Sequence, residues 1–135
     1  MLGISRKTLG TAALAGLCAI SLAAASPQPF HAHLTRSEPM ADSTVTTAPT
    51  TVKLWFSEAV QVAVTTIRVQ AHDGSSMTSA PVHQQGTGAA APLIATLPHP
   101  LANGRYTVTW RTMSADGHAV NGTFAFTVAS GLPAN

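Results

Sequence analysis

Residues 104–128 of this 135-residue chain read GRYTVTWRTMSADGHAVNGTFAFTV. Both ends of this stretch alternate apolar and polar residues, which is typical of strands that bury one face. The apolar positions are Tyr106, Val108 and Trp110 in the first half and Phe124, Phe126 and Val128 in the second. Asp116-Gly117 lies between the halves and favours a tight turn, because glycine accepts a positive φ and aspartate caps its own loop. The stretch therefore predicts an antiparallel hairpin.

The segments before this hairpin have the same β character. Val52, Leu54 and Phe56 repeat at every second position, as in a half-buried strand. Residues 61–70 are rich in β-branched side chains and favour another strand, in which a shift of the apolar phase near Thr66 predicts a bulge. The mature chain has no convincing helical period. We therefore expect an all-β protein built as a two-layer antiparallel sandwich.

Two connections carry local signals. Residues 72–92 are rich in Gly, Ser, Gln and Pro, which predicts a long exposed connection with at most one short edge strand. Asn103-Gly104 marks the turn into the strand that contains Tyr106. Together with Leu101, this spacing resembles a tyrosine corner, in which the tyrosine hydroxyl is bonded to nearby backbone.

The first 25 residues have the pattern of a secretory signal peptide. Arg6 and Lys7 precede an apolar run over residues 9–22, and small residues follow at 23–25. The run is short for a membrane span, so we do not expect a membrane anchor. Cys18 is the only cysteine and lies inside this segment, so the mature protein is expected to have no thiol.

The mature chain is expected to form one domain. We divide the sequence into a signal peptide (1–25), a short leader (26–30), the domain (31–129) and a C-terminal tail (130–135). About 110 residues remain after cleavage, a common size for a single domain. Two of the seven basic residues belong to the signal peptide, which leaves five against five acidic ones. Without a basic cluster, neither nucleic acid nor a membrane surface is an expected partner.

The turn of the hairpin carries the first candidate metal ligands. Asp116 and His118 are separated by one glycine, which lets both side chains turn toward one point. A carboxylate oxygen and an imidazole nitrogen could then share a metal ion. An ordinary turn without a metal fits the same residues, so this pair alone leaves both interpretations open.

A second cluster, His31-Ala32-His33, begins the domain. In an extended segment His31 and His33 would project from the same face. Two solvated histidines near a terminus would give the same pattern. Nitrogen and oxygen donors without a thiolate or a methionine cluster suit Cu(II), and zinc is an alternative on ligand type alone.

Six sequence blocks cover nearly the whole mature chain in a fixed order. They are HAHL at residues 31–34, SEP at 37–39, LWFSEAV at 54–60, GRYTVTWR at 104–111, SADGH at 114–118 and GTFAF at 122–126. In content, order and spacing these blocks resemble the CopC family of periplasmic copper-resistance proteins.

The resemblance implies a fold and a function. The fold would be a Greek-key β-sandwich or barrel, cupredoxin-like and with an immunoglobulin-like topology. The function would be to hold Cu(II) in the periplasm and hand it on without catalysis, as a monomer, with a separate inner-membrane copper transporter as a further partner. By position, His31 would chelate through its imidazole and α-amine, and Asp116 and His118 would complete the plane. Glu58 would be an acidic partner behind the ligands.

One departure from the family concerns this amine. The small residues before position 26 favour cleavage after Ala25, so the mature chain would begin at Ser26 and His31 would have no free α-amine. Either a second trimming exposes His31, or His33 joins the other three side chains as a ligand.

Another departure concerns methionine, since Met40, Met77 and Met113 are scattered and predict no dedicated Cu(I) site. Two other functions also stay open. One is a copper oxidase with an N-terminal histidine chelate, which oxidation of a polysaccharide would favour. The other is a metal-free, immunoglobulin-like structural module, which melting unchanged by Cu(II) would favour.

Overall fold

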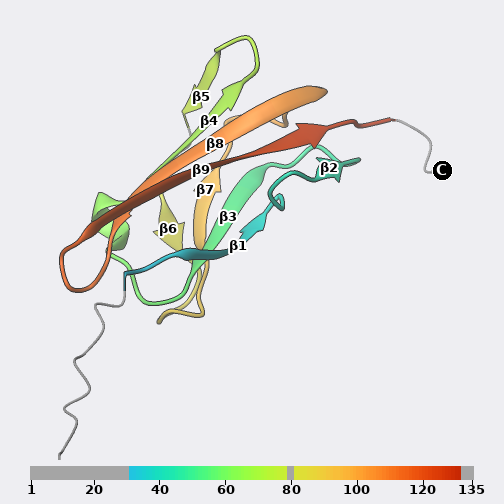
Figure 1. Ribbon diagram of the computed structural model, residues 1–135. Coiled ribbons are helices and arrows are strands. Elements are labelled where there is room, and N and C mark those ends of the chain that lie inside the picture. The colour runs from blue at the N-terminus through green and yellow to red at the C-terminus, as the bar shows by residue number, and fades with distance from the viewer. Residues whose placement is uncertain (1–30, 79–80, 132–135) are drawn as a thin grey trace, which may run out of the picture.

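The structure is a computed structural model that describes residues 31–78 and 81–131. The predicted signal peptide and leader lie outside these ranges, as does most of the predicted tail. The described chain forms two β-sheets that face each other (Figure 1). The expected all-β sandwich is confirmed.

One sheet has the strand order β1-β3-β7-β6, and the other has the order β2-β9-β8-β4-β5. All neighbours pair antiparallel except β2 and β9, which run parallel. Three of the four edge strands, β2, β5 and β6, are only two or three residues long. The elements are β1 (Leu34–Glu38), β2 (Thr44–Val45), β3 (Thr51–Phe56), η1 (Val62–Val64), β4 (Thr66–Ala71), β5 (Ser76–Thr78), β6 (His83–Gln84), β7 (Leu93–Thr96), β8 (Gly104–Met113) and β9 (Ala119–Val128).

The core lies between the two sheets and follows the predicted alternation. In β3, every second residue from Val52 to Phe56 is buried, and β8 buries every second residue from Tyr106 to Thr112. The rings of Phe56 and Trp110 meet edge to face, with centroids 5.1 Å apart, and so join the sheets. Burial of this apolar surface is the main stabilising contribution to the fold.

The strand expected over residues 61–70 is wrong in its first half. Residues 62–64 form the 3-10 turn η1, and β4 starts only at Thr66. The buried Thr65 explains the break: its hydroxyl donates to the Gln61 carbonyl at 2.8 Å and lies 2.6 Å from the Thr112 hydroxyl of β8. The β-branched side chains by themselves favour a strand here. The turn forms instead because it lets the two buried hydroxyls satisfy each other.

The connection over residues 72–92 holds two short edge strands, and not at most one. β5 pairs with β4 in one sheet, and β6 pairs with β7 in the other. The connection therefore crosses from one sheet to the other (Figure 1).

The predicted tyrosine corner is present at the start of β8. Tyr106 is buried, and its hydroxyl donates to the Ala102 carbonyl at 2.9 Å. Next to it, the Asn103 side chain accepts from the Ser130 amide at 2.7 Å and donates to the Ser130 carbonyl at 3.1 Å. These bonds fix the end of the sandwich at which β8 begins and β9 ends.

Candidate metal centre

The hairpin of β8 and β9 turns through residues 114–118 at the other end of these strands (Figure 1). The Ser114 amide donates to the His118 carbonyl at 2.9 Å, and the Gly117 amide donates to the Ser114 carbonyl at 3.0 Å. Gly117 has a φ of 91°, in the left-handed region that glycine adopts most readily. The predicted tight turn is thus present, and it places Asp116 beside His118.

Hydrogen bonds from three groups orient the Asp116 carboxylate. Its Oδ1 accepts from the Ser114 hydroxyl and, at 3.1 Å, from the His118 amide. Its Oδ2 lies 2.8 Å from Nδ1 of the His118 ring. The Ser114 hydroxyl first, and then the His118 amide and ring, hold the pKa of Asp116 well below its ordinary value. The loop therefore carries a fixed negative charge at its tip.

His31 approaches this loop from the start of the described chain. The His31 and His118 ring centroids lie 5.0 Å apart, with the rings nearly perpendicular. One donor atom from each of His31, Asp116 and His118 lies within 4.8 Å of the other two, and all three residues are exposed. The segments at residues 31 and 116 thus bring two imidazoles and a carboxylate together on the surface.

The residues after His31 hold it in this position. Ala32 is 3% exposed and is part of the buried interior. The His33 amide donates to the Ser57 hydroxyl at 3.1 Å, and the Ser57 amide donates to the His33 carbonyl at 2.9 Å. This short segment is therefore hydrogen-bonded to the residue that follows β3, just before β1 begins.

His33 and Glu58 lie outside the donor group. Among the described residues, the metal-binding arrangement comprises His31, Asp116 and His118 alone. His33 is exposed, and Glu58 is half-buried just beyond β3. The structure does not bring either residue into the cluster.

Ser114 is a functional candidate that the sequence reasoning missed. Its side chain is completely buried, and its hydroxyl donates to the Asp116 carboxylate. A hydroxyl two residues before a carboxylate in a hairpin turn could have indicated this role, because serine often bonds to groups two to four residues away. The residue orients Asp116 from inside the protein.

These features define a small β-sandwich with an exposed group of nitrogen and oxygen donors at one end. The model of the CopC domain family matches residues 34–129. The chain belongs to the CopC family, and this membership gives it a copper-related function. The matched range includes Asp116 and His118 and begins just after the segment that carries His31 and His33.

The chain is also similar to proteins of Escherichia coli. Protein YobA of strain K12 is 34% identical over 98 residues, which cover 73% of this chain and 78% of YobA. Copper resistance protein C is 34% identical over 103 residues, which cover 73% of this chain and 81% of the relative.

Two solved structures share the fold. CopC from Methylosinus trichosporium OB3b superimposes with a TM-score of 0.68 at 30% identity, over 78% of this chain and 100% of that one. PcoC from Escherichia coli, described as a methionine-rich copper resistance protein, gives a TM-score of 0.61 at 31% identity, over 74% of this chain and 100% of PcoC.

Within the residues that the structure describes, no helix is long and apolar enough to span a membrane.

Proposed function

We propose that this protein binds Cu(II) in the periplasm and carries or sequesters it for copper homeostasis, without catalysing a reaction. The observation that supports this proposal is the convergence of His31, Asp116 and His118, whose donor atoms lie within 4.8 Å of one another. Copper is the cargo of the protein in this proposal. The expected route is export with cleavage of residues 1–25, followed by loading of the domain over residues 31–129.

The chemistry of the donors favours Cu(II) over Cu(I). Imidazole nitrogen and carboxylate oxygen suit the tetragonal coordination of Cu(II), whereas Cu(I) prefers thiolate and thioether sulfur. The three methionines of the described chain do not form a sulfur site, since Met40 is exposed on a loop, Met77 packs against the core and Met113 ends β8.

Binding would compete with a proton. A ligating imidazole must have a free nitrogen lone pair, and in the metal-free arrangement Nδ1 of His118 is 2.8 Å from Asp116 Oδ2. A cation that binds at this carboxylate would replace the hydrogen bond between the two side chains. We therefore propose that loading weakens as the pH falls, because an imidazole protonated on both nitrogens has no lone pair for the ion.

The fourth position of the copper plane depends on processing. A chain that begins at Ser26 offers only the imidazole of His31, whereas a chain that begins at His31 adds the α-amine of the same residue. Because His33 lies outside the donor group, the side-chain-only set has three protein ligands and would leave one position to water. A chelating amine would fill that position.

A titration of the purified mature protein with Cu(II) tests the proposal. We expect one equivalent to bind, with a paramagnetic resonance spectrum typical of nitrogen and oxygen ligands in a tetragonal field. The mass of the same sample would give its first residue, and the nitrogen couplings would then show whether an amine is bound. A protein that binds no Cu(II) above the level of a variant lacking all three donor side chains would refute the function.

A further inference from the structure

The outer face of the β2-β9-β8-β4-β5 sheet is polar and has no acidic residue on its three central strands. Its outward side chains alternate with the core residues of β4, β8 and β9. The exposed polar ones are Thr66, Arg68 and Gln70 on β4, Arg105, Thr107, Thr109 and Arg111 on β8, and Asn121 and Thr123 on β9. This face is therefore positively charged although the described chain has equal numbers of acidic and basic residues.

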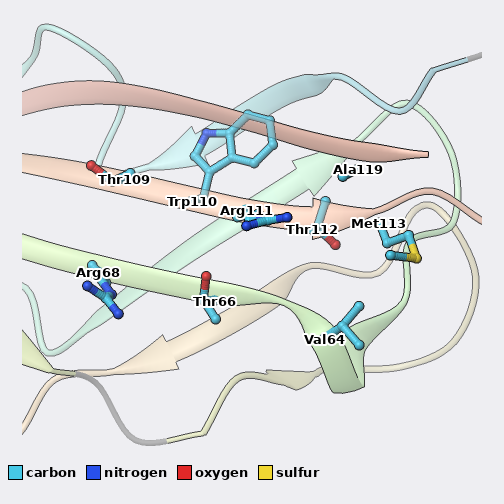
Figure 2. A pocket seen from close by; sticks show the side chains of 9 residues that line it. All are labelled: Val64, Thr66, Arg68, Thr109, Trp110, Arg111, Thr112, Met113 and Ala119. Carbon is cyan, nitrogen blue, oxygen red and sulfur yellow. The ribbon is translucent and has the colours of Figure 1, made fainter. Parts of the chain in front are cut away.

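Two of these arginines lie close together. Arg68 is paired across the sheet with Thr109, and Thr66 is paired with Arg111, so the two arginines are diagonal neighbours on one face. Both line a hollow of about 540 Å³ on the sheet surface (Figure 2). Neither side chain forms a hydrogen bond or ion pair with any other residue in the described ranges, 31–78 and 81–131.

The cationic side chains of the other sheet have partners within the protein. Arg36 forms an ion pair with Glu38 and lies over the Trp55 ring, 4.5 Å from its centroid. Lys53 is 3.8 Å from the same glutamate. The cations of that face thus have partners within the protein, whereas the guanidinium groups of Arg68 and Arg111 are available to a partner molecule.

The hollow adjoins the candidate copper centre. Met113 and Ala119 line it, and these two residues directly flank the loop that carries Asp116 and His118 (Figure 2). Val64 adds an apolar rim and is 49% exposed, one of two large apolar side chains that the described chain exposes to this degree. A molecule bound here would lie beside the base of the loop that carries Asp116 and His118.

We propose that this hollow docks an extended, carboxylate-bearing segment of a partner protein beside the copper loop. In such a segment, residues two apart project from one face about 7 Å apart, which is close to the separation of about 7–8 Å between diagonal neighbours in a sheet. A Glu-x-Glu segment can therefore match Arg68 and Arg111 with one carboxylate each. Arginine is well suited to this role, because its planar group binds carboxylates in a bidentate manner.

Other occupants fit the surface less well. Sites for small molecules enclose most of their ligand, but the residues with charged groups here stand exposed on a sheet. An anionic membrane surface is recognised by about four to eight clustered cations, and this hollow has two. The partner would give copper to this protein or take it away; that consequence rests on the proposed function, whereas the docking itself does not.

Nuclear magnetic resonance of the copper-free, isotopically labelled protein tests the docking. The probe is the peptide Ser-Glu-Leu-Glu-Ser with an acetylated and an amidated end, and the matched control peptide has glutamine at both glutamate positions. We expect the acidic peptide to shift the amide signals of the residues that line the hollow, in a saturable manner. The glutamine peptide should leave them in place.

Arg68→Gln combined with Arg111→Gln should weaken this binding at least about fivefold, because two exposed ion pairs are lost. The matched control is Arg105→Gln, which removes a cation from the same face of β8 outside the hollow. It should bind the peptide as the unmodified protein does. All these variants should bind Cu(II) as the unmodified protein does. The peptide titration uses copper-free protein, so its result would stand even if the protein proved not to bind Cu(II).

Three outcomes would overturn the proposal. The first is a set of amide shifts that do not saturate with peptide or that are scattered outside the hollow. The second is equal affinity of the double variant and the unmodified protein for the acidic peptide. The third is saturation of the same amide signals by free succinate at the same concentration as the peptide. The last result would indicate a site for small anions and not a docking surface for a protein segment.

Discussion

The two halves of the candidate copper centre are held in different ways. Asp116 and His118 belong to a tight loop whose backbone bonds and buried Ser114 fix the carboxylate before any ion arrives. His31 instead lies at the beginning of the described chain and depends on the buried Ala32 and on the backbone bonds of the next residue. One half is therefore preorganised within its loop, whereas the tethered half, His31, is held through the residues that follow it. Preorganised ligands should contribute more to affinity, because less conformational entropy is lost on binding.

Removal of a ligand from the preorganised half should have the largest effect. We expect Asp116→Ala and His118→Ala each to weaken Cu(II) binding by more than about 100-fold, since loss of groups behind a ligand alone typically costs about 10–100-fold. Competition against a copper-chelating dye measures this change. His99→Ala is the matched control, because it removes an exposed histidine that lies outside the donor group. An affinity unchanged in both loop variants would contradict the assignment.

The position of the first residue should change affinity next most strongly. A protein that begins at His31 adds an α-amine to the tethered half and should bind Cu(II) about 10–100-fold more tightly than one that begins at Ser26, because the second donor binds intramolecularly. Isothermal titration of the two purified forms gives the ratio. In the longer form, His31→Ala should cost less than either loop substitution. Equal affinities of the two forms would mean that the amine is not a ligand.

Ser114→Ala tests the preorganisation itself. We expect about tenfold weaker Cu(II) binding and altered copper resonance parameters, because the carboxylate loses the hydroxyl that orients it. The loss of one buried hydrogen bond should also lower stability by about 1 kcal/mol, which urea unfolding measures. A variant that loses stability but keeps the affinity and spectrum of the parent would show that Ser114 supports only the fold.

A smaller effect is expected on the stability of the copper-free protein as the pH changes. The pKa of Asp116 is lower in the folded protein than in the unfolded chain, so its ionised form favours folding above the ordinary carboxyl pKa of about 3.9. This contribution is lost as the pH falls below that value. Asp116→Asn should therefore lose less stability than the parent between pH 6 and pH 3. Identical pH dependence of unfolding in both proteins would contradict the role of this charge.

The smallest effect on copper is expected at the opposite end of the sandwich. Tyr106→Phe removes the hydroxyl bond to Ala102 and should cost about 1 kcal/mol of stability. It should leave Cu(II) affinity unchanged, because β8 separates the tyrosine corner from the loop by its whole length. Altered affinity in this variant would show that the two ends are coupled and that the loop is not preorganised locally.

Local pattern was enough to predict the elements that depend on neighbours in sequence. The alternation in β3, β8 and β9, the turn at Asp116-Gly117 and the tyrosine corner all follow from short-range rules. The 3-10 turn at residues 62–64 could not be predicted in this way, because it depends on the contact of Thr65 with Thr112 across the sheet.

The same limit applies to the candidate site. The spacing of Asp116 and His118 indicated one half of it, whereas the approach of His31 is a contact between segments far apart in the chain. Only the family resemblance suggested that approach. The role of Ser114 was missed because its burial depends on packing and not on its immediate neighbours.

The edges of the two sheets limit how the protein can associate. β2, β5 and β6 are two or three residues long, and the pairing of β1 with β3 is interrupted between Leu34 and Arg36. Long and regular edges would template the addition of a foreign strand and promote aggregation, but such short or irregular ones offer few consecutive free backbone groups. We therefore expect the protein to stay dispersed when it is abundant, and its encounters to use side chains on the flat faces.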